Sequence, residues 1–246
     1  MACSGPGPRS SSPDANPSSP WRTVAALPIA VQETAVVALD GQVWVLGGFE
    51  GQAGETSAVR IYDLATDSWS DGPALPMRGH HLGAAVDDGV IYVLGGLQGL
   101  GVTATGASWK LVPGASSWQP IAAMPVGSER GAGIAAASGG LLYVIGGLRA
   151  GQAVTDVSYY DPSSDEWHLG LEAMPERRDH LVGAAVGGAI YAIGGRDVSI
   201  SAITNRVDRY DPRTDSWTSA APMPTPRAGA AAALVDGRIV VAGGEG

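Results

Sequence analysis

Hydrophobic and polar positions alternate along the chain in short blocks, a pattern that predicts β-strands rather than helices. Residues 179–195 (DHLVGAAVGGAIYAIGG) hold two apolar runs separated by the pair Gly187–Gly188. Residues that tolerate positive φ are typical of tight hairpin turns. A third strand is expected at residues 205–211, and a turn containing Pro212 leads to a short fourth strand at Trp217. This stretch therefore predicts four antiparallel strands.

The same pattern recurs along the chain. Double glycines end 48 to 51 residues apart, at Gly48, Gly96, Gly147, Gly195 and Gly244. A tryptophan follows the first glycine of a pair by 21 to 23 residues, at Trp69, Trp118, Trp167 and Trp217. A proline lies seven or eight residues beyond each tryptophan. A fixed period of this length indicates a repeat architecture in which each unit packs on its neighbours.

Side-chain size indicates how the units pack. The first strand of each unit is built from small residues, as in GAAV at residues 83–86. Such a strand suits a crowded central axis where neighbouring units converge. The second strand is continuously apolar, which is typical of a strand covered on both faces. The tryptophans are large enough to fill wider gaps farther from the axis. The sequence therefore predicts wedge-shaped units arranged radially.

The double glycine, a tyrosine about 15 residues later and a tryptophan seven residues after that resemble the kelch repeat. The tyrosines are Tyr62, Tyr160 and Tyr210, whereas the second unit has Leu111 at this position. The resemblance covers residues 21–246 and implies an all-β kelch β-propeller of four-stranded antiparallel blades. It implies four complete blades plus a partial one, in repeats at about 31–76, 79–125, 130–175, 178–224 and 227–246.

The partial fifth unit supplies two strands. Propellers of this family often close by pairing strands from opposite ends of the chain, so the segment at Trp21 is expected to supply its fourth strand. Closure removes exposed sheet edges. We expect that the natural protein continues to a sixth blade; the alternative is a five-bladed ring with one thin blade.

Residues 1–20 are rich in Ser, Pro and Gly and are interpreted as a disordered tail. The alternative is that Cys3 is the lipid-bearing residue of a bacterial lipoprotein. Cell-envelope or secreted localisation would follow from lipidation of Cys3, and cytoplasmic localisation from its absence, so the compartment stays open.

Composition excludes several classes of function. A net charge of −9 argues against nucleic acid as the partner. A single cysteine excludes a disulfide framework and a cysteine-rich zinc site. It also excludes the Tyr–Cys crosslink of galactose oxidase, a kelch-fold enzyme. No apolar run is long enough for a transmembrane segment.

The resemblance places candidate ligand-binding residues on one rim of the channel. Counting back from each double glycine gives Glu33, His81, Arg130, Arg178, His180 and Arg227, and the loops after the glycines add Arg149 and Arg196. Rim arginines carry recognition in kelch domains that bind acidic peptides, and guanidinium groups pair well with carboxylates. The alternative is that each arginine is structural, for example pairing Arg178 with Asp179 or Arg196 with Asp197.

The histidines do not predict a metal site. His81 and His180 are two blades apart and are expected to face a channel too wide for joint coordination. His80 is expected to point to the opposite face of its strand, and His168 lies on an outer strand. We therefore expect neither a metal nor another cofactor.

The favoured function is a non-enzymatic scaffold that binds a protein segment or a small polar ligand on the rim. One alternative is a carbohydrate-acting enzyme similar to the sialic acid mutarotases, with Glu33, His81 and His180 as acid–base groups. Another alternative is a structural lipoprotein of the cell envelope.

Overall fold

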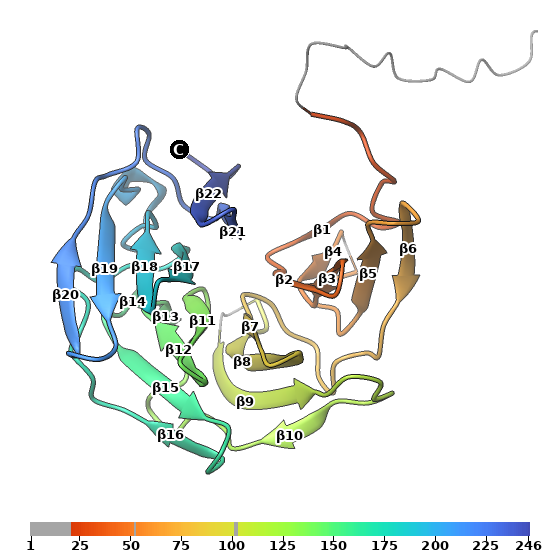
Figure 1. Ribbon diagram of the computed structural model, residues 1–246, viewed down its shortest axis with the longest axis horizontal. Helices are drawn as coiled ribbons and strands as arrows, with labels where there is room; N and C mark the ends of the chain where they lie inside the picture. The colour runs from red at the N-terminus through yellow and green to blue at the C-terminus, as the bar shows by residue number, and fades with distance from the viewer. Residues whose placement is uncertain (1–20, 52, 101–102) are drawn as a thin grey trace, which may run out of the picture.

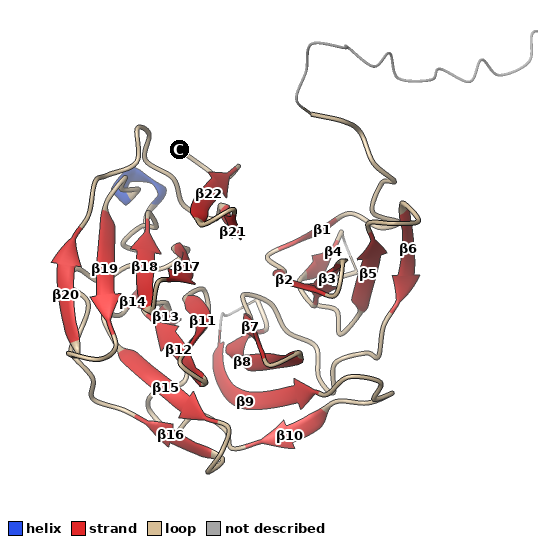
Figure 2. Cartoon of the chain, in the orientation of Figure 1, coloured by secondary structure: helices blue, strands red, loops and turns tan. Residues whose placement is uncertain are grey.

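The computed structural model describes residues 21–246 except residues 52 and 101–102. Cys3, the candidate lipidation site, lies outside the described residues. The described chain is a radial array of antiparallel sheets around a central channel (Figures 1 and 2). Four sheets have four strands each, and a two-stranded sheet follows them in the array.

The first two blades are built from consecutive stretches of chain. The first blade consists of β2 (Ala35–Leu39), β3 (Gln42–Leu46), β5 (Val59–Asp63) and β6 (Ser68–Asp71). The second consists of β7 (Gly83–Asp87), β8 (Val90–Gln98), β9 (Thr103–Leu111) and β10 (Gln119–Ile121).

The next two blades repeat this order, and the last sheet holds only two strands. The third blade consists of β11 (Ile134–Ser138), β12 (Leu141–Ile145), β15 (Val157–Asp161) and β16 (Glu166–His168). The fourth consists of β17 (Val182–Val186), β18 (Ala189–Ile193), β19 (Val207–Asp211) and β20 (Ser216–Ser219). The two-stranded sheet consists of β21 (Ala231–Val235) and β22 (Arg238–Ala242).

Short elements lie outside the five sheets of the array. β1 (Val31–Gln32) pairs with β4 (Phe49–Glu50), and β13 (Leu148–Arg149) pairs with β14 (Gln152–Ala153). A 3-10 helix, η1 (Ile200–Ala202), lies between β18 and β19. The described part of the chain contains no helix with the length and hydropathy needed to cross a membrane.

The innermost strands follow one another around the channel in the order β2, β7, β11, β17, β21. The small residues of these strands suit this close approach. A Cβ atom added at Gly83 on β7 would lie 2.7 Å from the Leu94 carbonyl oxygen and 3.3 Å from the Ala135 Cβ atom of β11. The prediction that the strand of small residues lies at the centre is therefore confirmed.

The double glycine lets the next blade approach. Gly146 has φ +61°, and a Cβ atom there would lie 2.7 Å from Met174 Cε and 2.9 Å from the Arg178 carbonyl oxygen. Gly147 N–H donates to that same carbonyl at 2.9 Å. The backbone conformation disfavours a side chain at Gly146, and the close contacts leave no room for one.

The recurring tyrosine, aspartate and tryptophan form a clamp between successive blades. In the third blade, Trp167 Nε1–H donates to the Ala122 carbonyl at 2.7 Å, and Asp165 Oδ1 accepts from Ala122 N–H at 2.7 Å. The same Asp165 oxygen accepts from the Tyr160 hydroxyl at 2.7 Å. Because Ala122 follows β10, these bonds join the outer edges of the second and third blades.

The segment at Trp21 does not close the ring in the predicted way. Within the described residues, β21 and β22 pair only with each other, and Trp21 is 81% exposed in a stretch without strand structure. The segment instead contacts the first blade: Ala25 N–H donates to Asp67 and Ala25 accepts from Trp69 Nε1–H. The clamp residues of the first blade therefore hold Ala25 as those of the third blade hold Ala122, and this anchors the segment away from β22.

Candidate functional site

A chain of backbone hydrogen bonds passes from blade to blade around the channel. Its members are equivalent residues, and all have φ between 51° and 57°: Glu33, His81, Ala132, His180 and Gly229. Each N–H after the first donates to the preceding member's carbonyl, at 2.9, 3.0, 2.8 and 2.8 Å. These bonds hold residues about 50 positions apart in the sequence next to one another.

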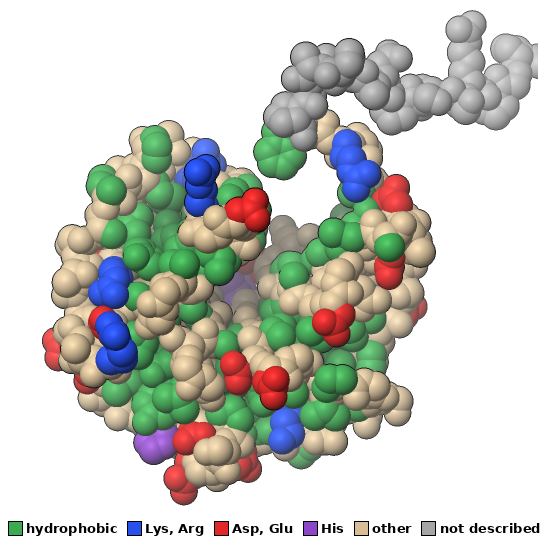
Figure 3. Space-filling model, in the orientation of Figure 1, with side chains coloured by type: hydrophobic (Ala, Val, Ile, Leu, Met, Phe, Trp, Pro, Cys, Tyr) green, Lys and Arg blue, Asp and Glu red, His purple; other side chains and the backbone are tan. Residues whose placement is uncertain are grey.

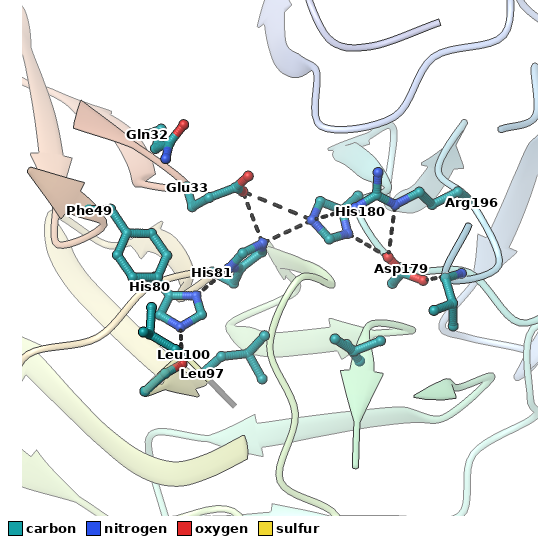
Figure 4. A pocket seen from close by; sticks show the side chains of 13 residues that line it. Gln32, Glu33, Phe49, His80, His81, Leu97, Leu100, Asp179, His180 and Arg196 are labelled. Carbon is teal, nitrogen blue, oxygen red and sulfur yellow. Dashed lines mark hydrogen bonds and ion pairs between the residues drawn. The ribbon is translucent and has the colours of Figure 1, made fainter. Parts of the chain in front are cut away.

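The expectation that His81 and His180 face a channel too wide for joint coordination is wrong. Their Nε2 atoms lie 2.9 Å apart, and the rings meet edge to face with centroids at 4.7 Å (Figure 4). The residue between them in the backbone chain is Ala132, whose methyl group leaves room for the two imidazoles.

The expectation that His80 points away from His81 is also wrong. His80 Nδ1 lies 2.5 Å from His81 Nδ1. The left-handed backbone of His81 breaks the alternation of a regular strand, so both rings lie on the same side (Figure 4). His80 is buried, and burial lowers its pKa.

Glu33 faces both histidines of the channel (Figure 4). Its Oε2 lies 2.9 Å from His81 Nε2 and 4.0 Å from His180 Nε2. The contact with the His81 side chain lowers the pKa of Glu33 and outweighs the effect of partial burial, which raises it. Glu33 is therefore an ionised acceptor at neutral pH.

Asp179 holds His180 and Arg196 in place by hydrogen bonds. It is buried and accepts from His180 Nδ1 at 2.5 Å, from Val198 N–H at 2.7 Å and from Arg196 Nε at 3.4 Å. Burial raises the pKa of Asp179, but the hydrogen bonds from His180 and Val198 outweigh it and leave the pKa below its ordinary value. Arg196 also pairs with Glu245.

These side chains line a cavity of about 400 Å³ at the mouth of the channel. Its polar lining residues are Gln32, Glu33, His80, His81, Asp179, His180 and Arg196, and its apolar lining includes Phe49, Leu97 and Leu148. Figure 3 shows a histidine at the bottom of the central hollow. The volume suits a small ligand or one side chain of a larger partner.

Two of the predicted rim arginines lie inside the protein instead. Arg130 is 1% exposed and donates to the carbonyls of Ser128, Val144 and Gly146 and to the Ser158 hydroxyl, at 2.8 to 3.0 Å. Burial lowers its pKa to about 10. Its guanidinium group is thus committed to the interior of its own blade.

Arg178 and Arg227 repeat this arrangement. Arg178, 2% exposed, donates to the Gly194 carbonyl at 2.9 Å and pairs with Asp208 at 2.6 Å, and burial lowers its pKa. Arg227 donates to the Gly243 carbonyl at 2.7 Å. Each arginine therefore satisfies the carbonyl of the first glycine in its own double glycine.

Arg149 pairs with Asp156 through two contacts of 3.1 Å and does not line the cavity. Of the eight predicted residues, the structure brings together Glu33, His81, His180 and Arg196. The local pairings suggested for the arginines are not formed: Arg178 binds Asp208, and Asp197 binds Arg177.

Sequence reasoning missed His80, Asp179 and Phe49 as cavity residues. The two polar residues immediately precede His81 and His180, so the pairs His80–His81 and Asp179–His180 were the available signals.

Blades of four antiparallel strands around a channel with a polar mouth define a β-propeller. The chain belongs to the kelch-repeat family, because the model of the kelch motif matches residues 33–76, 135–170 and 177–224. The unmatched second blade is the one with Leu111 in place of tyrosine.

Proteins similar in sequence or structure support the assignment to the kelch-repeat family. The chain is 31% identical over 240 residues to the Kelch-like protein terF of Aspergillus terreus, covering 91% of this chain and 52% of the relative. It is 37% identical over 139 residues to mouse Kelch-like protein 26, covering 54% of this chain and 22% of the relative. The solved structure of YjhT superposes with a TM-score of 0.77 at 15% identity, over 91% of this chain and 80% of that one. The chain thus spans about half or less of the length of these curated relatives.

Proposed function

We propose that the protein is a non-enzymatic binding scaffold that takes a polar group of its ligand into the cavity at the mouth of the channel. The observation that carries this proposal is the convergence of Glu33, His81, His180 and Arg196, from three different blades, on one cavity of about 400 Å³. Loops held by a rigid ring provide preorganised binding groups. Membership of the kelch family supports a protein segment as the ligand.

The cavity offers both donors and acceptors, so a ligand of mixed polarity suits it better than a strongly acidic one. Because Arg130 and Arg178 are buried in their blades, Arg196 is the guanidinium group among the cavity residues. A side-chain amide, a hydroxyl group or a single carboxylate would find partners there, while Phe49 and Leu97 would cover apolar atoms beside it.

Binding can be tested with an array of immobilised peptides and glycans of known composition. Probes that bind the wild-type protein saturably are then titrated against Arg196→Ala. A lost hydrogen bond to a charged group costs about 1.5–3 kcal/mol, so affinity should fall roughly 10- to 100-fold. Arg213→Ala, on the outer turn before β20, is the matched control and should bind normally. The proposal fails if no probe binds saturably, or if the two variants bind alike.

A second candidate is an acid–base enzyme acting on a sugar, as in the sialic acid mutarotases that the kelch resemblance includes. The pairs Glu33–His81 at 2.9 Å and Asp179–His180 at 2.5 Å favour it, because each couples a carboxylate to an imidazole inside a cavity. Anomer exchange of reducing sugars, sialic acid included, can be followed by NMR. An enzyme would accelerate exchange and lose this rate on Glu33→Gln; a wild-type rate equal to that of buffer rejects the candidate.

A further inference from the structure

Three potential metal ligands from three blades converge in the cavity. The atoms are Glu33 Oε2, His81 Nε2 and His180 Nε2, all within 4.8 Å of one another (Figure 4). Their separations are 2.9 Å between the two nitrogens, 2.9 Å from Glu33 to His81 and 4.0 Å from Glu33 to His180. Ligands placed tetrahedrally at about 2.0–2.1 Å from a zinc ion lie about 3.3 Å apart, which these three distances bracket.

The hydrogen bonds of His180 direct a lone pair into this group. Its Nδ1 lies 2.5 Å from the Asp179 carboxylate, which only accepts, so the proton of the neutral ring is on Nδ1. Its Nε2 faces Arg196 Nη2 at 3.2 Å, and a guanidinium group only donates. The Nε2 atom of His180 is therefore an acceptor.

The hydrogen bonds of His80 and His81 lead to the same result. His80 Nε2 lies 3.3 Å from the Gly99 carbonyl oxygen and 3.3 Å from the Glu55 carboxylate, and both are acceptors. A neutral, buried His80 therefore carries its proton on Nε2 and accepts through Nδ1. His81 Nδ1, 2.5 Å away, must then donate, which leaves the Nε2 of a neutral His81 as an acceptor.

With a neutral His81 all three atoms are acceptors, and two of their three separations are only 2.9 Å. Such an arrangement is repulsive unless a positive charge lies among the three atoms. An extra proton on His81 would supply this charge, and so would a metal ion. Two imidazoles and one carboxylate are the donor set of catalytic zinc sites, in which a further position stays open.

We propose that Glu33, His81 and His180 bind a divalent transition-metal ion of the zinc type at the mouth of the channel. Asp179 and His80 act as positioning residues, because each hydrogen-bonds the Nδ1 atom of a metal-binding histidine. Metal binding requires the Arg196 guanidinium group to move off His180 Nε2. The open coordination positions face the cavity, where they would accept an oxygen or nitrogen atom of the ligand; this last step rests on the proposed binding function.

Metal binding can be measured on the purified chain after removal of bound metals with a chelator. Calorimetric titration with Zn²⁺ should give one equivalent per chain with a dissociation constant of about 1 µM or below. Binding should disappear in His180→Ala and in Glu33→Gln, and Asp179→Asn should weaken it about 10- to 100-fold. Co²⁺ should give the intense visible absorption of a four-coordinate site, and that spectrum should be lost in the same variants.

Controls separate this site from other metal ligands. His168→Ala removes an exposed histidine that stacks on Tyr159 at the outer edge of the third blade, and should leave binding unchanged. Cys3→Ser removes the thiol and should also leave it unchanged. Circular dichroism of the metal-free variants checks that each one is folded.

The inference is overturned if the folded wild-type chain binds neither Zn²⁺ nor Co²⁺, which would indicate a proton on His81. Binding that survives His180→Ala, or that is lost in His168→Ala, overturns it as well. Repeating the peptide and glycan array in the presence of chelator tests the proposed function separately: binding that persists there keeps the scaffold without the metal.

Discussion

Replacing Arg130 by alanine should destabilise the propeller without acting on the cavity. The guanidinium group makes four hydrogen bonds in the interior of the third blade. At roughly 1.5 kcal/mol for each bond to a charged group, these contribute about 6 kcal/mol. Burial opposes this: it lowers the pKa of Arg130 to about 10, and this fall corresponds to about 3 kcal/mol against the charged form.

The difference leaves about 3 kcal/mol, which the alanine variant loses because four buried acceptors no longer have this donor. For a chain of this length the melting temperature should fall by about 10 °C. Differential scanning fluorimetry measures this shift, and far-UV circular dichroism at 20 °C checks that the variant is folded before heating.

Arg149→Ala is the matched control for this experiment. Arg149 belongs to the same repeat and makes two contacts to Asp156, but its side chain is 29% exposed. A solvent-screened ion pair of this kind is worth about 1 kcal/mol or less. If Arg130→Ala and Arg149→Ala melt within about 2 °C of each other, the assignment of Arg130 to the packing of the blade is refuted.

Two further predictions concern the clamp and the double glycine. In urea unfolding, Gly146→Ala should lower the free energy of unfolding by about 1–3 kcal/mol more than Gly139→Ala does. Both glycines have φ near 60°, but of the two only Gly146 has close neighbours around an added Cβ atom. Equal losses of free energy in the two variants would contradict the packing argument. The pKa of Asp165 is lowered by the Ala122 N–H and then by the Tyr160 hydroxyl. The stabilisation from ionised Asp165 is therefore present above about pH 4 and is lost as the pH falls below that value. Asp165→Asn should make the free energy of unfolding depend less on pH between about pH 5 and pH 3. An unchanged slope argues against the clamp.

Much of the fold could be predicted because the repeated residues are determined by backbone conformation and by the space around each position. Gly146 has positive φ, as does the first glycine of the pair in every other unit, so the double glycine recurs along the chain. The tryptophans mark the clamp between blades. The closure at Trp21 could not be predicted in the same way, because the contacts of Ala25 with Asp67 and Trp69 compete with pairing to β22.

The candidate site could be predicted only in part. Counting from the double glycines located Glu33, His81 and His180, since equivalent positions in a ring of repeats face the same channel. The same count also selected Arg130 and Arg178, which turn into their blades to bind carbonyl groups. Spacing identifies equivalent backbone positions, but it does not determine the direction of a long side chain.

The sequence by itself determined the repeat, the strand order within a blade and the inner position of the small-residue strands, because each depends on local conformation and side-chain size. Only the tertiary structure decided that His81 and His180 touch and that Arg130 is buried. These outcomes depend on how far apart equivalent residues lie across the channel and on which acceptors surround a guanidinium group. Both are set by the packing of one blade against another, which no single repeat encodes.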